Sequence, residues 1–380
     1  MDSLYHHSLR IIKQSQSKSG AYIASPNFPT YHYCWLRDGS FIAHAMDTAG
    51  EYVSAESFFR WVGRTVQKFG YKVEEVKRRL DAGLQLGKDD LLHTRYTLDG
   101  EEVTVDDTWG NFQIDGYGTW LWALGEHVHR TGDTAILQEL SEPIEITLHY
   151  LQLVWMLPNY DCWEEHPEFL HPYSLATVYA GFQSIADLVR TGEMRPVSVP
   201  VDDLAAQVKA FILKSGVKDG KLIKLFSATE GNPASQYIDK NSVDSSLIGV
   251  SMPFQVLANN DPIMLLTVQE IEKDLHQPGG GVYRYKGDVY YGGGEWLLLT
   301  AWLGWYYTSI KQFDQAKRLC EWIESKADAN GFLAEQISEH PLESVHVQPW
   351  IKKWGPVAKP LTWSHAMYII LANAIKEGNT

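Results

Sequence analysis

Two adjacent carboxylates in the segment LPNYDCWEEH, residues 157–166, have the residue types of an acid catalyst. Glu164 and Glu165 directly follow Trp163 in a loop flanked by proline, which is not the pattern of a helix surface. A neighbouring like charge and an apolar indole ring both disfavour ionisation, so they raise the pKa of one of the two carboxyls. A carboxyl that stays protonated near neutral pH can serve as a general acid. Glu164 is therefore the candidate acid of this sequence.

Acid catalysis of this kind suits the hydrolysis of an acetal, which also needs a second carboxylate on the opposite face of the bond. In an inverting mechanism this second group activates water and stands roughly 6.5–9.5 Å from the first, against about 5–5.5 Å when configuration is retained. Glu335, in the segment GFLAEQISEH at 331–340, follows a predicted helix and could face Glu164 from another loop. The surrounding residues alone leave Glu335 an ordinary loop carboxylate, and the sequence does not fix the separation.

An arginine and an aspartate stand side by side in the segment TYHYCWLRDGSFIAHAMD, residues 30–47, just after several aromatic residues. Asp38 could accept hydrogen bonds from two sugar hydroxyls while Arg37 donates in a fork. Asp38 is equally well placed as the N-cap of the helix that follows, and Arg37 could pair with a surface carboxylate. These residues alone leave both interpretations open.

Two further segments place aromatic and polar residues at predicted helix starts. In DDTWGNFQIDGYGTWLWAL, residues 106–124, Trp109, Gln113 and Asp115 stand just ahead of a helix, where capping is the alternative explanation. In KPLTWSHAMYIILA, at 359–372, Trp363 stands at the mouth of the final predicted helix.

The segment GGGVYRYKGDVYYGGGEWLLLTAWL, residues 279–301, contains glycine clusters that raise the hypothesis of a phosphate-binding loop. No GK[ST] motif follows and no strand–loop–helix context surrounds it, which argues against that hypothesis. Arg284, between two tyrosines, instead has the surroundings of another clamp for hydroxyl groups. Glu295 opens a predicted helix, and we assign it a structural role in which its charge compensates the helix dipole.

Tryptophan is frequent in this sequence, with 14 residues. An indole ring can pack a helical core, but it can also stack on the apolar face of a sugar ring while its N–H bonds a hydroxyl. Several tryptophans stand beside carboxylates in polar or glycine-rich stretches, a placement that core packing alone does not favour. We therefore expect a sugar site that includes Trp35, Trp109, Trp163, Trp296 and Trp354.

The overall composition argues against several classes of partner. A formal net charge of -14 disfavours nucleic acid and anionic membranes, whose phosphates would be repelled. No stretch has the uninterrupted apolar length of a membrane span, and no secretory signal is visible. The three cysteines match neither a disulfide framework nor a zinc site, and the histidines form no HExxH motif. We expect a cytoplasmic protein without a metal or other cofactor, whose oligomeric state the sequence leaves open.

Helical periodicity dominates the chain and predicts roughly a dozen helices, joined by irregular segments rich in Gly, Pro, Asp and Trp. Polar, tryptophan-bearing loops recur between helix pairs, which favours a closed double-layered barrel over an open array. No linker divides the chain and no short repeat is evident, so we expect one domain, residues 1–380. The predicted helices cover 3–15, 37–49, 52–69, 116–131, 134–157, 174–190, 202–214, 244–258, 262–275, 295–310, 312–328 and 363–376, and the predicted hairpins 91–105, 218–226 and 280–291.

Six ordered pieces of the chain carry a family resemblance: YHYCWLRD at 31–38, WGNFQIDGYG at 109–118, WEE at 163–165, GGGVYRY at 279–285 with YYGGGEW at 290–296, AEQ at 334–336 and PLTWSHA at 360–366. Together they resemble the catalytic domain of glucoamylase-like enzymes, glycoside hydrolase family 15. The pieces span most of the chain, and six in order are far more specific than any one. The resemblance implies an all-α fold, an (α/α)6 barrel with short β-hairpins in the loops. It also implies inverting hydrolysis that releases β-glucose from the non-reducing end of α-glucans.

Position by position, the resemblance implies that Glu164 is the general acid and Glu335 the general base. It also implies that Arg37 and Asp38 grip the terminal glucose. The other residues that it places at the substrate are Tyr31 and Trp35 on the wall of that subsite, Glu165 and Arg284 as further contacts, and Trp109, Tyr291 and Trp363 along the pocket.

The substrate is expected to be a small intracellular oligosaccharide, because the chain carries neither the β-sandwich nor the starch-binding module of many relatives. The family acts on α-1,4, α-1,6 and trehalose linkages, and we favour isomaltose or short isomalto-oligosaccharides. The alternatives are a maltooligosaccharide glucoamylase, a trehalase of the same fold, and a non-catalytic sugar-binding protein. The presence of both glutamates argues against the last. Linkage choice is expected to lie in loops near 166–173, 227–242 and 340–356.

Overall fold

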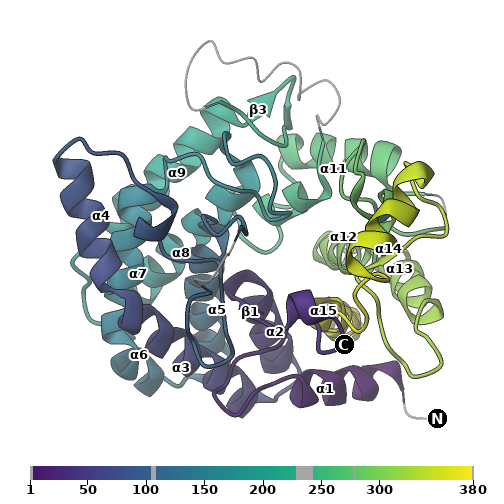
Figure 1. Ribbon diagram of the computed structural model, residues 1–380, viewed down its shortest axis with the longest axis horizontal. Helices are drawn as coiled ribbons and strands as arrows, with labels where there is room; N and C mark the ends of the chain where they lie inside the picture. The colour runs from purple at the N-terminus through teal and green to yellow at the C-terminus, as the bar shows by residue number, and fades with distance from the viewer. Residues whose placement is uncertain (1–2, 104–107, 228–242, 278, 379–380) are drawn as a thin grey trace.

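An inner ring of helical segments forms the centre of the molecule (Figure 1). The computed structural model describes residues 3–103, 108–227, 243–277 and 279–378. Each inner segment packs against the next, and the last returns to the first, so that the ring closes. In order around the ring they are α2 (Leu36–Thr48), α5 (Asp115–Thr131), α8 (Pro172–Arg190), the 3-10 helix η3 (Ser245–Val250), α12 (Leu297–Ser309) and α15 (Thr362–Glu377).

A second layer of helices covers the outside of this ring, one for each inner segment. The outer helix α1 packs on α15, so the first and last helices lie side by side (Figure 1). This alternation of inner and outer helices is an (α/α)6 barrel, which confirms the predicted fold class. The outer helices are α1 (Leu4–Gln14), α3 (Tyr52–Phe69), α7 (Ser141–Val154), α9 (Val201–Ser215), α11 (Pro262–Leu275) and α13 (Phe313–Ser325).

The two layers differ in how their side chains are buried. In the inner helix α12, every residue from Leu297 to Tyr307 is buried, since the helix has neighbours on all sides. The outer helix α13 buries only Ala316, Leu319 and Ile323, whose spacing places them on one face. The two helices therefore differ in how much of their surface is covered, and most of the buried apolar residues form one continuous core.

Close packing between inner helices depends on glycine at one position in particular. A Cβ on Gly118 of α5 would lie 2.3 Å from the carbonyl oxygen of Thr177 in α8. A contact that short with backbone cannot be relieved by a side-chain rotation. Gly118 thus allows two inner helices to approach each other at the centre of the barrel.

Within the described residues, three α-helices lie outside the double ring, and two of them were not predicted. α4 (Tyr71–Asp81) buries a narrow face on α7 and α3. α14 (Val347–Trp354) packs against the 3-10 helix η4 (Tyr290–Gly292). The predicted helix 134–157 is divided at Leu140 into α6 (Ala135–Glu139) and α7.

The prediction of a helix over 244–258 is wrong, because only Ser245–Val250 is helical there and the type is 3-10. Pro253 lacks the amide hydrogen that a continuing helix would need. Gln255 takes a φ of 51°, which also lies outside the helical region. A short, tight segment therefore fills the fourth place in the inner ring.

The strands are short and pair in twos, and one predicted hairpin is confirmed: β3 (Val217–Lys218) with β4 (Lys221–Leu222). The prediction at 91–105 is wrong in its pairing, because β2 (Arg95–Tyr96) pairs with the distant β1 (Cys34–Trp35), and residues 104 and 105 lie outside the described part of the chain. The hairpin at 280–291 is also wrong. Its Val282 forms isolated bridges instead, and β5 (Glu295–Trp296) pairs with β6 (Gln336–Ile337).

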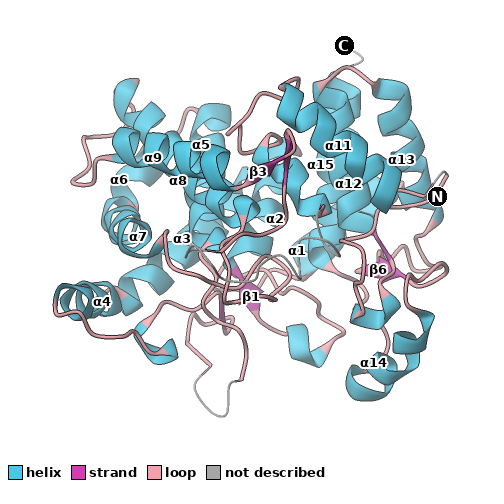
Figure 2. Ribbon diagram, turned by 90° about the horizontal axis from the view of Figure 1, so that it is seen from above, coloured by secondary structure: helices cyan, strands magenta, loops and turns pink. Residues whose placement is uncertain are grey.

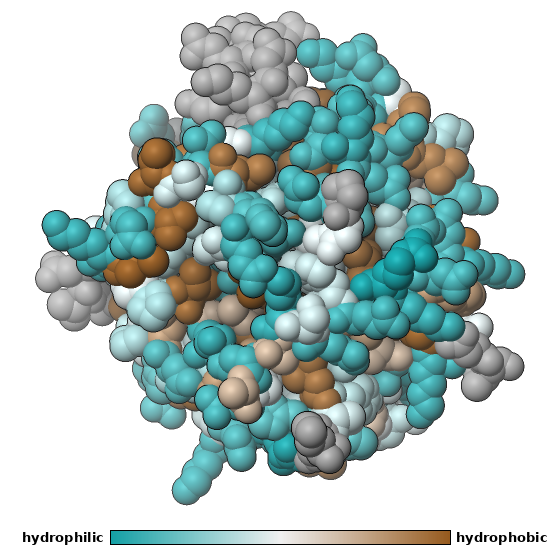
Figure 3. All heavy atoms as spheres, turned by 90° about the vertical axis from the view of Figure 1, so that its right-hand side faces the viewer, coloured by the Kyte–Doolittle hydropathy of each residue, from teal (hydrophilic) through white to brown (hydrophobic). Residues whose placement is uncertain are grey.

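Loops gather at one end of the barrel, where β1, β6 and α14 also lie (Figure 2). The helices α2, α12 and α15 begin at residues that follow these loops and strands, so their first turns face this end. The surface around α13 and α14 is mostly hydrophilic, with apolar side chains in small separate groups (Figure 3). Among the residues that the structure describes, none of the helices combines the length and the apolar character needed to cross a bilayer.

Candidate active site

A pocket with a volume of about 390 Å³ lies among these loops and the starts of α2, α12 and α15. This is within the range of pockets that hold small ligands. All but one of the predicted catalytic and binding residues line it, namely Glu164, Glu335, Tyr31, Trp35, Arg37, Asp38, Trp109, Glu165, Arg284 and Trp363.

Glu164 stands on a sharp turn that projects its side chain into the pocket. Its φ of 68° is in the left-handed region, which a residue other than glycine adopts only when its surroundings hold it there. The indole N–H of Trp35 donates to Oε1 of Glu164 at 2.6 Å, and the guanidinium of Arg37 lies 3.8 Å from the same oxygen. Glu164 is thus gripped from one side while it remains open to the pocket.

Arg37 is buried and held by polar groups at the start of α5. Its Nη1 donates to Gln113 at 2.9 Å and to Asp115 at 3.1 Å. The guanidinium also lies 5.6 Å from the centre of the Trp363 ring, a cation–π contact. The alternative in which Arg37 pairs with a surface carboxylate is therefore excluded.

Asp38 lies in the first turn of α2, 3.4 Å from Nε of Arg37. The N-cap of this helix is Trp35, so the capping alternative for Asp38 is wrong. Burial raises the pKa of Asp38 to about 7, although the neighbouring Arg37 opposes the rise. A buried acceptor beside an arginine has the chemistry required to bind hydroxyl groups.

Glu335 lies in the loop that leads into β6, and it is almost completely buried. Gln336 fixes this loop by accepting from the amide of Gly294 at 2.6 Å and donating to the carbonyl of Tyr290 at 3.1 Å. Burial raises the pKa of Glu335 to about 8, whereas Arg284 and the hydroxyls of Tyr290 and Tyr31 oppose this rise. The carboxyl is thus shielded from solvent and has a few polar groups beside it.

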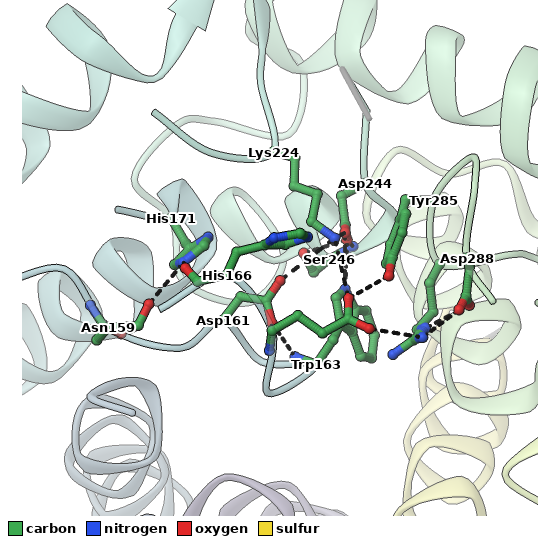
Figure 4. A network of polar contacts seen from close by, with 12 residues as sticks. Asn159, Asp161, Trp163, His166, His171, Lys224, Asp244, Ser246, Tyr285 and Asp288 are labelled. Atoms are coloured by element: carbon green, nitrogen blue, oxygen red, sulfur yellow. Dashed lines mark hydrogen bonds and ion pairs between the residues drawn. The ribbon is translucent and has the colours of Figure 1, made fainter. Parts of the chain in front are cut away.

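Glu165 and Arg284 lie in the pocket wall, where they contact Tyr285 and Asp288 of the polar network in Figure 4. Arg284 pairs with Asp288 through Nε at 2.7 Å, and its Nη2 lies 3.6 Å from Glu165. Glu165 also accepts a hydrogen bond from the hydroxyl of Tyr285. The predicted contact pair is therefore in place, with each partner oriented by a further side chain.

The five tryptophans that were expected at a sugar site all line the pocket. Trp109 packs edge to face against Trp35, with ring centres 5.9 Å apart, and the guanidinium of Arg95 lies 4.2 Å from the Trp109 ring. Trp163 and Trp296 meet at 5.4 Å on the wall that also holds Arg284. Aromatic side chains thus form a large part of the surface that a substrate would touch.

Neither Tyr290 nor the helical form of 347–354 was predicted from the sequence, although Trp354 was expected at the sugar site. The hydroxyls of Tyr290 and Tyr31 are 2.7 Å apart, and both tyrosines line the pocket. α14 adds Trp350, Lys353 and Trp354 to the lining. A signal for it was present, because positions three and four residues apart lie on one face of a helix.

Tyr291 is the predicted pocket residue that the structure does not place in the lining. Its φ of 49° reverses the chain after Tyr290, so that Tyr290 takes the pocket wall. Tyr291 packs behind it against Trp350, and its hydroxyl donates to the carbonyl of Gly355 at 2.9 Å. Glu295 also lies outside the lining; it accepts from the amide of Gly281 at 2.7 Å, a structural contact.

Among the described residues, no group of three or more His, Cys, Asp or Glu side chains is arranged to hold a metal ion. The cysteines are free thiols, and Cys162 belongs to the pocket lining. Of the loops expected to choose the linkage, 340–356 contributes α14, whereas 228–242 lies outside the described residues.

A helical barrel whose loop end holds two carboxylates in a tryptophan-lined pocket has the parts of a glycoside hydrolase. Sequence comparison establishes that class. The profile described as "Glycosyl hydrolases family 15" matches residues 1–373, so the chain belongs to this family and is a glycoside hydrolase.

Known relatives differ in how similar they are to this chain. An isomaltose glucohydrolase of Kribbella flavida is 35% identical over 376 residues, which cover 99% of this chain and 93% of the relative. Trehalase 2 of Sulfolobus acidocaldarius is 20% identical over 358 residues, covering 90% of this chain and 60% of that enzyme.

Solved structures agree with the fold. A wild-type glycosidase superposes with a TM-score of 0.89 at 36% identity, covering 98% of this chain and 96% of the other. A bacterial glucoamylase complexed with acarbose has a TM-score of 0.73 at 20% identity, covering 99% of this chain and 56% of that one, a likeness of fold alone.

Proposed function

We propose that this glycoside hydrolase removes glucose from the non-reducing end of short α-glucans with inversion of configuration, and that isomaltose or short isomalto-oligosaccharides are its preferred substrates. The observation that carries the proposal is that one pocket contains both predicted catalytic glutamates together with the arginine–aspartate pair. The similarity over nearly the whole length to an isomaltose glucohydrolase supports the linkage.

The terminal glucose would be held by Arg37 and Asp38. Both are buried at the start of α2, and Asp115 and Gln113 fix the guanidinium so that it need not reorganise when a sugar binds. The indole rings of Trp35 and Trp363 offer apolar faces beside them. Such a buried, charged cradle suits a chain end better than the middle of a polymer.

Glu164 would donate its proton to the glycosidic oxygen while Glu335 takes a proton from a water molecule. The water oxygen bonds to the anomeric carbon from the face opposite the leaving group, and the carbon–oxygen bond to the second sugar breaks. The products are β-glucose and the remaining sugar, whose glycosidic oxygen is now a hydroxyl group. Proton exchange with solvent then restores the starting protonation of both carboxyls. No cofactor takes part in this sequence.

The polar groups near Glu164 and Glu335 also allow the reverse assignment of acid and base. A pKa of about 8 for Glu335 would by itself suit an acid, and the donors beside Glu164 would suit a base. The family motifs WEE and AEQ support Glu164 as the acid and Glu335 as the base. A substrate whose leaving group needs no protonation distinguishes this assignment from the reverse one. α-Glucosyl fluoride releases fluoride without help from an acid, so Glu164→Gln should spare its hydrolysis and abolish that of isomaltose. Glu335→Gln should abolish both, and the opposite result would exchange the roles.

Linkage preference is tested by measuring glucose release from isomaltose, maltose and trehalose side by side. The proposal predicts the highest kcat/KM on isomaltose. A preference for maltose or trehalose would identify the enzyme as a glucoamylase or a trehalase of the same fold. Binding of glucose without release from any of them would point to a sugar-binding protein. We further propose action in the cytoplasm, which the free thiols support, and cell fractionation would test it.

A further inference from the structure

Lys224 is a buried ammonium group close to the pocket, but it is not part of the pocket wall. It follows β4 in the chain, and its Nζ reaches between two aspartates that come from different loops (Figure 4). Nζ lies 3.2 Å from Asp244 and 3.6 Å from Asp161, with Glu165 at 3.9 Å. The aromatic ring of Tyr285 closes the remaining side.

Asp161 builds the turn on which Glu164 stands. One of its carboxylate oxygens accepts from the backbone amides of Trp163 and Glu165, each at 2.9 Å. The backbone amide of Glu164 donates to the carbonyl of Asp161 at 2.9 Å, and the amide of Asp161 donates to the carbonyl of Glu165 at 3.0 Å. Oδ2 of Asp161 is buried and faces Lys224.

Asp244 holds the same turn from the other side. It accepts from the indole N–H of Trp163 at 2.9 Å, and the amide and hydroxyl of Ser246 donate to it at 2.8 Å and 2.6 Å. Trp163, the residue before Glu164, is therefore bound twice: Asp161 accepts from its backbone amide, and Asp244 accepts from its indole N–H. Both aspartates carry negative charge inside the protein, where like charges repel strongly.

We propose that Lys224 is a positioning residue for the acid-bearing turn, because it binds Asp161 and Asp244 together and so holds Glu164 in its left-handed conformation. The inference rests on the proposed function, in which Glu164 is the acid. Lys224 does not touch the substrate, since its side chain is only 2% exposed and does not line the pocket.

Without the ammonium group, the two aspartates would lose the cation they share. Asp161 would then take up a proton or turn away, and its carboxyl would bind the amides of Trp163 and Glu165 less strongly. A left-handed glutamate relaxes once such contacts weaken. The acid would move relative to the glycosidic oxygen, whereas the base and the glucose cradle belong to other elements and would stay in place.

The test compares isomaltose with α-glucosyl fluoride in the full-length enzyme. Lys224→Met should lower kcat on isomaltose about 100-fold, the size of effect that a small misplacement of a catalytic group produces. Hydrolysis of the fluoride, which needs no acid, should fall far less, and the affinity for glucose should stay the same. Lys224→Arg, which keeps the charge, should restore the ratio of the two rates. The matched control Lys221→Met, on the preceding strand and paired with Glu270 at 3.3 Å, should leave both rates unchanged.

An equal loss on both substrates in a folded Lys224→Met enzyme would overturn the proposal, and so would unchanged rates. If the methionine variant does not fold, Lys224→Gln, which keeps a hydrogen-bond donor but lacks the charge, carries the same comparison. Failure of the proposed function itself is distinct, because the wild-type enzyme would then release no glucose from any disaccharide of the panel.

Discussion

At the scale of single residues, the environment of Glu335 decides how the enzyme should respond to pH. Its carboxyl is buried, and the hydroxyls of Tyr31 and Tyr290 stabilise the ionised form. A general base works only when it is ionised, so kcat/KM should rise with pH along the limb that this group controls. Since its pKa is raised to about 8, that limb should lie well above the usual range of glutamate.

Tyr290→Phe should move this limb to still higher pH. Loss of one hydroxyl removes a hydrogen bond that favours the carboxylate, and its usual energy corresponds to a displacement of about half a pH unit to one unit. The pH dependence of kcat/KM on isomaltose measures it. Tyr291→Phe is the matched control, because that hydroxyl donates to Gly355 behind the wall. A shift toward lower pH, or an equal shift in the control, would contradict the account.

Glu335→Gln should stabilise the protein near pH 7 while it abolishes turnover. The pKa of this carboxyl is about 8 in the folded chain and about 4.3 in the unfolded one. Between these values the unfolded chain releases a proton that the folded chain retains, so stability falls as pH rises. Glutamine cannot ionise, and we expect a gain on the order of 1–3 kcal/mol in unfolding free energy at pH 7.

Urea unfolding of Glu335→Gln at pH 4 and at pH 7 measures this gain, which should vanish at the lower pH. The surface variant Glu343→Gln provides the control, and its stability should match the wild type at both values. A gain that is the same at both pH values would show that ionisation is not its cause.

At the scale of elements, the site combines the first turns of inner helices, the loops that carry the two glutamates, and one added helix. Arg37 and Asp38 begin α2, Asp115 begins α5 and Trp363 begins α15, so the barrel itself fixes their positions. α14 stands apart from the rings and brings Trp350, Lys353 and Trp354 to the pocket. We therefore expect the barrel elements to serve the terminal glucose and α14 to serve the rest of the substrate.

Trp354→Ala tests this division. Loss of an aromatic contact with the second sugar should raise KM for isomaltose about five- to tenfold, which corresponds to roughly 1 kcal/mol. The value of kcat should change by less than about twofold, because a contact made equally in ground and transition states affects only binding. Val345→Ala, at a side chain that is 73% exposed and outside the pocket lining, is the control. A fall in kcat with KM unchanged would contradict this role for α14.

Most elements with regular periodicity could be predicted from the sequence, apart from α4 and α14, and so could the motif residues attached to them. Arg37 and Trp363, for example, lie in the first turns of helices that the periodicity predicts. The position of Tyr290 could not be predicted, because a left-handed residue at 291 decides which of two adjacent tyrosines faces the pocket. The pairing of β1 with β2 joins residues about sixty positions apart, and only the closed barrel brings them together.

At the scale of the whole molecule, the described core is continuous from the first helix to the last, since α1 packs on α15 and the inner ring closes. We propose that residues 1–380 form a single domain. Calorimetry should then show one unfolding transition, with loss of helical signal and loss of activity at the same temperature. Two resolved transitions, with activity lost in only one, would divide the chain into separate units.

The central claim is that glucose leaves this pocket with inverted configuration, and proton NMR of the first product tests it most directly. With isomaltose as substrate, the anomeric signal of β-glucose should appear first, and α-glucose should follow only at the rate of mutarotation. Appearance of α-glucose first would mean that configuration is retained, and that Glu164 and Glu335 do not act as the acid and base of an inverting pair.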